Sequence, residues 1–447
     1  MSFPRYPKYK DSGVEWLGNV PGHWALDRIK WSTVGCKNGI WGDEAKDDEN
    51  DIPCVRVADF DRQRLRVELS EPTIRNVTQN ERTGRVLSRG DLLLEKSGGG
   101  ELQPVGCVVL YDDDHPAVCS NFVARVQIAP GMSSSFWRYL HAAAYAVRLN
   151  TRSIKQTSGI QNLDQQQYLD ERAGFPPSGE QIQIAAFLDR ETAKIDALVA
   201  EQRRLIDLLK EKRQAVISHA VTKGLNPHAP MKDSGIEWLG SVPAHWTVKR
   251  FQRCVHVAEG QVDPADAAFS ELSLIAPNHI ESGTGRLLAL ETADEQGAES
   301  GKYLCKTGDV VYSKIRPALR KVCVAPEDCL CSADMYPLRA HSGLTNPFLF
   351  WLILSDHFSA FAVLESQRVA MPKINRESLK AVLFAVPPPT EQSLIAAFLG
   401  RETAKIDALT AEAQQTIDLL QERRTALISA AVTGKIDVRG LVGTEAA

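Results

Sequence analysis

Apolar residues recur with heptad spacing in two long segments of the chain. In each segment we consider the ten positions spaced alternately by four and three residues, from Ile184 to Val216 and from Ile395 to Leu427. In both segments, seven of the ten positions are apolar. This spacing is typical of a helix with one continuous apolar seam. Proline pairs precede both segments and a glycine follows each, so we expect two helices of roughly 40 residues, each about 60 Å long. We expect the seams to pair with each other; the alternative is that each seam packs on its own globular domain.

The chain contains two tandem half-molecules. KDSGVEWLGNVPGHW at Lys10–Trp24 returns as KDSGIEWLGSVPAHW at Lys232–Trp246, an offset of 222 residues. IAAFLDRETAKIDAL from Ile184 returns as IAAFLGRETAKIDAL from Ile395, an offset of 211 residues. Each copy of the second block follows a proline cluster and Glu-Gln, PPSGEQ in the first half and PPPTEQ in the second. Between the shared blocks the halves differ, so a common frame carries two different inserts.

The inserts show the pattern of mixed domains. Short apolar runs that follow Gly-Asp turns predict buried strands, the runs after them predict further strands, and helical segments come next. In the first half we expect strands at Leu92–Leu94 and Val105–Tyr111, a helix at Phe136–Leu149 and a strand-like segment at Gln166–Phe175. In the second half we expect strands at Val310–Tyr312 and Lys321–Ala325, a helix at Pro347–Val363 and a strand-like segment at Ser378–Val386. This order of elements predicts an α+β fold.

The charge is distributed unevenly over the 447 residues, whose formal net charge is -4. Residues His115–Leu163 contain no acidic side chain but five basic ones, Arg125, Arg138, Arg148, Arg152 and Lys155. Residues Lys302–Val324 contain six basic residues and one acidic residue, Asp309. Acidic residues gather at Asp43–Asp51. The two basic stretches fit local DNA binding, and the alternative is two solvated faces without a partner.

Several classes of protein are disfavoured by the sequence. The nine cysteines show no zinc-site spacing or disulfide framework, so we expect no metal and a reducing, cytoplasmic environment. No run is apolar enough to cross a membrane, and the first ten residues do not look like a secretory signal. A Gly-rich cofactor loop, a P-loop and the Asn/Asp-Pro-Pro-aromatic motif of adenine methyltransferases are all missing. We therefore expect no catalytic residue and no cofactor.

Histidine and tryptophan residues recur in the shared frame. His23 and His245 stand in Pro-x-His-Trp in both halves, and a structural hydrogen bond is favoured over catalysis. The matched tryptophans are Trp16, Trp24, Trp238 and Trp246. Base stacking is possible for them, but residues of the common frame are better suited to a core or subunit contact.

The combination of these blocks resembles the specificity subunits of type I restriction-modification systems. The resemblance rests on the KDSG-[VI]-EWLG-x-VP-x-HW block, the insert, and PP-x-x-EQ-x-x-IAAFL with its heptad helix, all present twice. It implies a non-catalytic subunit in which each half holds a target recognition domain. The long helices would pair as an antiparallel, pseudo-twofold coiled coil that holds the recognition domains apart.

The same resemblance implies that each recognition domain reads one part of an interrupted site in double-stranded DNA. Its expected partners are modification (methyltransferase) subunits, two in number, and restriction (translocase and nuclease) subunits. The expected recognition domains are 1–175 and 227–386; the helices occupy 176–226 and 387–436, and 437–447 form a tail.

Candidate DNA-binding residues lie in the loops after the Gly-Asp strands and in a turn near the end of each recognition domain. Arginine can bond guanine with two hydrogen bonds, whereas lysine and serine suit phosphates or bases. The loop candidates are Lys96, Ser97, Gly98, Lys314, Arg316, Arg320 and Lys321. The turn candidates are Lys155, Gln156, Ser158 and Gln161 in the first half, and Gln367, Arg368, Met371 and Lys373 in the second, which departs from the family's Gly- and Gln-rich pattern.

Two other functions stay open at this point. The chain could serve as the specificity partner of a fused nuclease-methyltransferase, or as a coiled-coil scaffold without a DNA role. The scaffold explains the helices, but it leaves the two divergent basic inserts unexplained.

Overall fold

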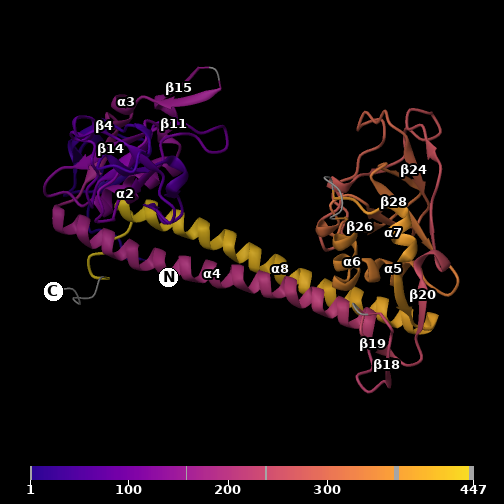
Figure 1. Ribbon diagram of the computed structural model, residues 1–447. Helices are drawn as coiled ribbons and strands as arrows, with labels where there is room; N and C mark the ends of the chain where they lie inside the picture. Colours follow the sequence, from indigo (N-terminus) through magenta and orange to yellow (C-terminus); the bar gives the residue numbers. More distant parts are fainter. Residues whose placement is uncertain (1–2, 158, 237–238, 367–371, 442–447) are drawn as a thin grey trace. The chain divides into compact units, whose positions relative to one another are not determined.

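A computed structural model describes residues 3–157, 159–236, 239–366 and 372–441. It divides the chain into two compact units, and the division runs through both long helices. The first unit holds Met1–Glu201 with Thr416–Ala447, and the second holds Gln202–Gln415. Each unit contains a mixed α/β domain and a stretch of both helices (Figure 1).

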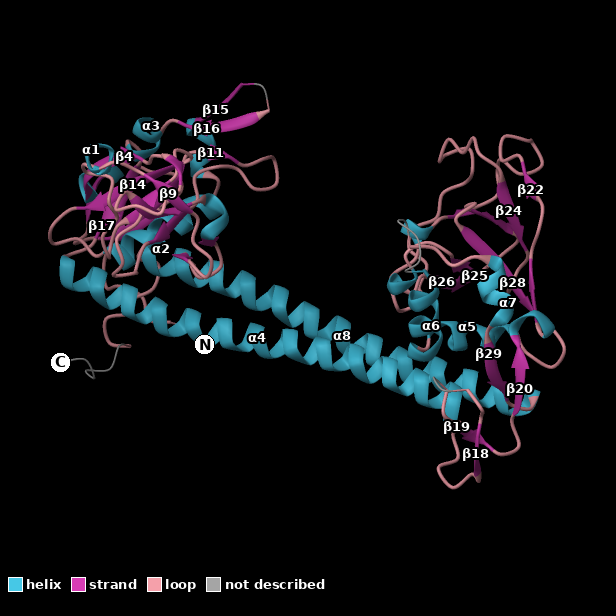
Figure 2. Cartoon of the chain, in the orientation of Figure 1, coloured by secondary structure: helices cyan, strands magenta, loops and turns pink. Residues whose placement is uncertain are grey.

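The first unit is organised around a six-stranded sheet of order β4-β14-β10-β12-β8-β7. Figure 2 labels β4 and β14 of this sheet. The strands are β4 (Thr33–Asn38), β14 (Val123–Ile128), β10 (Leu92–Glu95), β12 (Val108–Leu110), β8 (Arg66–Val67) and β7 (Phe60–Asp61). β10 lies inside the sheet, antiparallel to both neighbours, and all four of its side chains are buried. This burial explains why Leu92–Leu94 are a continuous apolar run that does not alternate, while the buried Glu95 carboxylate pairs with Arg62 at 2.7 Å.

Smaller sheets complete the first unit. A four-stranded sheet contains β13 (Val118–Cys119), β6 (Asp51–Val55), β9 (Ile74–Asn76) and β5 (Asp43–Glu44). A three-stranded sheet contains β11 (Ser97–Gly98), β16 (Ile160–Leu163) and β15 (Ile154–Thr157). Two strand pairs join β1 (Tyr9–Asp11) to β2 (Asn19–Pro21), and β3 (Ala25–Arg28) to β17 (Arg172–Phe175). The shorter helices are α1 (Gln79–Arg82), α2 (Ser134–Ala146) and α3 (Gln165–Leu169).

The second unit repeats this plan with smaller sheets. One four-stranded sheet contains β21 (Val255–Val257), β28 (Met335–Ala340), β25 (Val310–Ser313) and β26 (Val322–Val324). The other contains β22 (Gln261–Val262), β24 (Lys302–Cys305), β27 (Cys329–Cys331) and β23 (Leu274–Ile275). The strand pairs are β18 (Met231–Asp233) with β19 (Ser241–Pro243), and β20 (Thr247–Arg250) with β29 (Leu383–Val386). Its shorter helices are α5 (Asn346–Leu354), α6 (Asp356–Ser366) and α7 (Arg376–Ala381).

The two predicted long helices are confirmed. α4 (Ser178–Lys223) has 46 residues and begins directly after the first proline pair, and α8 (Pro389–Val432) has 44 residues. In the first unit, Ile184 and Leu188 of α4 share a core with Ile428 and Val432 of α8. The start of one helix therefore packs beside the end of the other, which is antiparallel pairing.

The second unit shows the same pairing with the roles of the helices exchanged. Here Ile217 and Val221, near the end of α4, share a core with Ile395 and Leu399, near the start of α8. The α+β prediction and the antiparallel helix pair are thus confirmed within each unit.

The strict heptad seam, however, is wrong in the middle of the helices. Leu198, Leu205 and Leu409 are 43–52% exposed, whereas Val199 and Ile206, one residue after the first two, are buried.

Three details of the predicted elements are wrong. The expected helix over Pro347–Val363 is two helices, α5 and α6, bent by 64° at Ser355. The expected strand-like segments Gln166–Phe175 and Ser378–Val386 are strands only in their last four residues and lie partly in helices α3 and α7. In the described part of the chain, no single helix is long and apolar enough to cross a membrane; the bent pair passes that test only by length and composition.

Candidate nucleic-acid interface

The first-half candidates meet in the three-stranded sheet β11-β16-β15. Ser97 and Gly98 form β11 and pair with Asn162 and Gln161 of β16. Lys155 lies opposite Asn162 on β15. The sheet therefore brings the loop and the turn together, although more than 50 residues separate them in the sequence. The β15–β16 hairpin projects from the side of the first unit that faces away from α4 (Figure 1).

Alternation along β16 separates an outward face from an inward face. The Asn162 side chain is exposed, whereas Gln161 and Leu163 are buried. The Ser97 hydroxyl donates to Asn162 Oδ1 at 2.6 Å. Asn162 was not among the sequence-based candidates, although the alternation Gln161, Asn162, Leu163 could have indicated an outward side chain.

The other turn candidates differ in their exposure. Gln161 Oε1 accepts the backbone N–H of Val105 at 3.2 Å, so this buried side chain supports the fold. Lys155 Nζ contacts Asp164 Oδ2 at 2.7 Å, and Gln156 is exposed on the same strand. Ser158 lies outside the described residues.

Lys96 is the residue at which this sheet joins β10. It is half-buried, and burial lowers the pKa of its ammonium group below the ordinary value. Its backbone N–H donates to Phe122 O at 2.8 Å, and its carbonyl accepts Leu163 N–H at 2.8 Å. Phe122 itself is 50% exposed, which places a large aromatic side chain on the surface beside this lysine.

In the second unit, Lys314 follows β25 as Lys96 follows β10. Lys314 Nζ donates to Ala333 O at 2.6 Å and lies 5.5 Å from the Tyr336 ring centroid. Lys373 is exposed and pairs with Ile315 in an isolated antiparallel bridge. The loop and the end of the second turn therefore also meet here.

The remaining second-half candidates fall into two groups. The exposed Arg316 side chain has no hydrogen bond or ion pair within the described residues. Arg320 contacts Asp356 Oδ1 at 2.8 Å, and Lys321 Nζ donates to Pro277 O at 2.6 Å. The latter two cations thus have partners inside the unit. Gln367, Arg368 and Met371 lie outside the described residues.

Most residues of the two basic stretches have partners in the fold. The two Gly-Asp carboxylates, Asp91 and Asp309, are buried and pair with Arg125 and Arg339 at 2.7 and 2.6 Å. Further cation–acceptor pairs are Arg138–Asp189, Arg152–Glu15, Lys155–Asp164 and Lys306–Asp328. The basic surplus along the sequence therefore overstates the free positive charge, because carboxylates from distant segments pair with it.

The frame histidines make structural contacts. His23 Nε2 lies 2.7 Å from Glu180 Oε2, and the buried Trp24 indole donates to Glu180 Oε1 at 2.9 Å. In the second unit, His245 lies 2.7 Å from Glu391, to which buried Trp246 donates at 3.2 Å.

The frame tryptophans also make structural contacts. Burial rules out base stacking for Trp24 and Trp246. Trp16 is partly exposed and donates its indole N–H to Arg172 O at 3.1 Å, while Trp238 lies outside the described residues.

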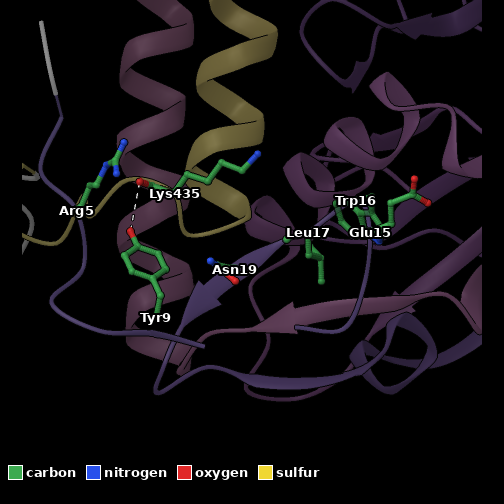
Figure 3. A pocket seen from close by; sticks show the side chains of 8 residues that line it. Arg5, Tyr9, Glu15, Trp16, Leu17, Asn19 and Lys435 are labelled. Carbon is green, nitrogen blue, oxygen red and sulfur yellow. Dashed lines mark hydrogen bonds between the residues drawn. The ribbon is translucent and has the colours of Figure 1, made fainter. Parts of the chain in front are cut away.

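A surface pocket of about 350 Å³ lies among the frame segments of the first unit (Figure 3). Its lining includes Arg5, Tyr9, Trp16 and Lys435, and the Tyr9 hydroxyl donates to Lys435 O at 3.4 Å. Only Trp16 of these four belongs to a repeated block, and none of the lining residues is a candidate DNA-binding residue, so the pocket is separate from the candidate interface. Among the described residues, no group of three or more His, Cys, Asp and Glu side chains could hold a metal ion.

Comparisons with known proteins agree with this architecture. Residues 276–419 match the type I restriction modification DNA specificity domain. The EcoDI specificity subunit of Escherichia coli is 30% identical over 282 residues, 60% of this chain and 63% of that subunit. The EcoBI specificity subunit of Escherichia coli is 21% identical over 335 residues, 72% of this chain and 70% of that subunit. Residues 276–419 therefore match a type I restriction modification DNA specificity domain, and the chain is similar to the specificity subunits of type I restriction-modification systems.

Solved structures show the same fold. A chain from a type I R-M system, solved to study complex assembly and conformational transition, matches with a TM-score of 0.67 at 17% identity, covering 92% of this chain and 98% of that chain. The HsdS subunit from Thermoanaerobacter tengcongensis matches with a TM-score of 0.52 at 15% identity, covering 93% and 98%. The fold of this chain is therefore found in both solved proteins.

Proposed function

We propose that this chain is the DNA-reading subunit of a type I restriction-modification complex. Each unit recognises one part of an interrupted site in double-stranded DNA, and the chain directs modification and restriction subunits to that site. The chain supplies recognition and no catalysis, and it acts in the cytoplasm. The expected recognition domains are residues 1–175 and 227–386.

The observation that carries the proposal is the same lysine-centred arrangement on two otherwise divergent inserts. Lys96 and Lys314 each follow a buried Gly-Asp strand, and each meets a segment from the end of its own recognition domain. A shared frame with divergent surfaces suits two related binding tasks with different targets. The similarity to DNA specificity subunits adds DNA as the target, which the coiled-coil scaffold alternative does not explain.

The test is to map methylated bases in a host that expresses the chain together with its modification subunit. We expect one methylated motif with two specified parts separated by unspecified bases. Hosts that express either subunit alone should show no such motif. An identical methylation pattern with and without the chain would overturn the proposal.

A further inference from the structure

Lys96 and Lys314 occupy equivalent places in the two units, as their backbone amides show. The Lys96 N–H donates to Phe122 O at 2.8 Å, and the Lys314 N–H donates to Asp334 O at 3.0 Å. Phe122 and Asp334 both stand just before a central strand, β14 in one unit and β28 in the other. The same backbone position therefore carries an aromatic ring in one unit and a carboxylate in the other.

The lysine carbonyls make a second matching contact. Lys96 O accepts Leu163 N–H at 2.8 Å, and Lys314 O accepts Ile374 N–H at 2.9 Å. Leu163 and Ile374 are both buried and lie 211 residues apart, the offset of the shared helix block. Two contacts of the same kind on either side of each lysine establish the structural equivalence of the two sites.

The residue before each buried anchor points outward. Asn162 pairs with Ser97, the residue after Lys96, and Lys373 pairs with Ile315, the residue after Lys314. Both Asn162 and Lys373 are exposed. They are thus the same position on a common framework, occupied by an amide in one unit and an ammonium group in the other.

We propose that Asn162 and Lys373 are equivalent base-reading positions, one for each part of the site. This inference rests on the proposed function. Residues that are identical in both units, such as Lys96 and Lys314, cannot account for different targets. A pair of residues at one equivalent position with different hydrogen-bonding groups can do so, and both side chains are exposed to a ligand.

The two side chains match different bases. The Asn162 amide offers a donor and an acceptor together, which fits the N7 and N6 edge of adenine in the major groove. The Ser97 hydroxyl at 2.6 Å orders this amide and leaves one lone pair of Oδ1 and both amide hydrogens for a base. Lys373 has donors only, and these fit the O6 and N7 acceptors of guanine.

The experiment compares methylated motifs in hosts that carry the modification subunit and one chain variant. We expect Asn162→Ala to make one adenine position of a single part degenerate, with discrimination falling about 5- to 150-fold, and to leave the other part unchanged. Lys373→Ala should make a guanine position degenerate in the other part only. Asn80→Ala is the matched control, because Asn80 is an exposed asparagine on α1 of the same unit.

A second variant guards against a folding defect. Asn162→Asp keeps the acceptor for Ser97 and removes the amide hydrogens, so the preference at that position should move from adenine towards cytosine. If the wild-type chain directs no bipartite motif, the proposed function fails. If it does, but both Asn162 variants methylate the wild-type motif with unchanged discrimination, the proposed function stands and this inference is wrong.

Discussion

At the scale of single residues, Glu180 joins the two sequence blocks that recur in the chain. It accepts hydrogen bonds from Trp24 and Tyr6 and contacts His23. Burial and the neighbouring Glu180 raise the pKa of Tyr6 well above its ordinary value, so this hydroxyl stays a donor. Glu391 takes the equivalent place in the second unit, but its side chain is 25% exposed against 6% for Glu180.

Glu180→Ala should therefore destabilise the chain more than Glu391→Ala. Removal of the Glu180 carboxylate leaves two buried donors without an acceptor, and we expect a loss of about 3 kcal/mol in the free energy of unfolding. Glu391→Ala should cost about 1 kcal/mol, because it leaves one buried donor, the Trp246 indole, without an acceptor, whereas His245 is exposed to water. Urea unfolding followed by tryptophan fluorescence measures both losses. Equal losses would contradict the structural role assigned to Glu180.

His141 should make stability depend on pH. It is fully buried on α2, with Nδ1 2.8 Å from the Tyr168 hydroxyl, and burial lowers its pKa from 6.5 to about 4. The folded state thus binds the proton less readily than the unfolded state. Its contribution is complete above pH 6.5 and is lost as the pH falls from 6.5 towards 4.

We expect this histidine to account for a loss of about 2 kcal/mol between about pH 7 and pH 5. His141→Asn keeps a hydrogen-bonding atom for Tyr168 and has no titrating group. The difference in unfolding free energy between the wild type and this variant should therefore shrink or reverse as the pH falls. A difference that does not change with pH would show that His141 titrates normally.

At the scale of elements, the paired helices contain a matched set of ion pairs. Arg424 of α8 contacts Asp196 of α4 at 3.3 Å in the first unit, and Arg213 of α4 contacts Asp407 of α8 at 3.1 Å in the second. Each pair repeats the other with the helices exchanged, because Asp407 and Arg424 lie 211 residues after Asp196 and Arg213. Asp196 is 17% exposed and Asp407 is 50% exposed.

This difference in exposure predicts unequal effects of two equivalent substitutions. Asp196→Ala leaves the buried Arg424 without its carboxylate and should cost about 2–3 kcal/mol. Asp407→Ala should cost less, about 1–2 kcal/mol: Arg213 is as buried as Arg424, but it still donates to Thr284 O at 3.2 Å, and Asp407 itself is half exposed. The reversed pair Asp196→Arg with Arg424→Asp should recover part of the first loss. Thermal unfolding measures the stability of each variant. If the reversed pair is no more stable than Asp196→Ala, the two residues do not stabilise the chain through their charges.

The predictable elements were those whose pattern is local. The two long helices and the buried runs after Gly-Asp turns depend on spacing within one segment, and both were predicted. The strict heptad register was wrong at Leu198, Leu205 and Leu409, which are exposed, because a helix of 3.6 residues per turn drifts out of a 3.5-residue repeat.

The break between α5 and α6 was missed because Ser355 sits in an apolar helical pattern. Its hydroxyl donates to Leu352 O and accepts Phe358 N–H, so it caps one helix and starts the next.

The missed helices α3 and α7 did carry a local signal. Asp164 accepts the N–H groups of Gln166 and Gln167, and Asn375 accepts that of Ser378. Both are N-cap residue types, which mark the start of a helix. Reading these caps would have separated each short helix from the strand that follows it.

The candidate site was only partly predictable, because strand pairing and ion pairing are long-range. Lys96 and Lys314 were candidates from the sequence because each follows a predicted Gly-Asp strand. The sequence did not show that Asn162 lies beside Ser97. It also counted Arg125 as free positive charge, whereas the buried Asp91 pairs with it across the sheet.

At the scale of the whole molecule, the chain carries two copies of a common frame with two different inserts, and its sequence has no cofactor loop, P-loop or methyltransferase motif. The purified chain alone should therefore bind no S-adenosylmethionine and methylate no DNA. Isothermal titration calorimetry with this cofactor is the measurement. Saturable binding would contradict the proposal that a separate modification subunit supplies the cofactor and the chemistry.

The central claim is that each unit reads its own part of one site. Its most direct test is the affinity of the chain, assembled with its modification subunits, for duplexes in which one part of the mapped site is scrambled at a time. Scrambling either part should weaken binding by at least about tenfold, since each wrong base pair typically costs about 1–3 kcal/mol, while scrambling the bases between the parts should leave the affinity unchanged. If either part can be scrambled without loss of affinity, the two units do not share the reading of one site and the account is wrong.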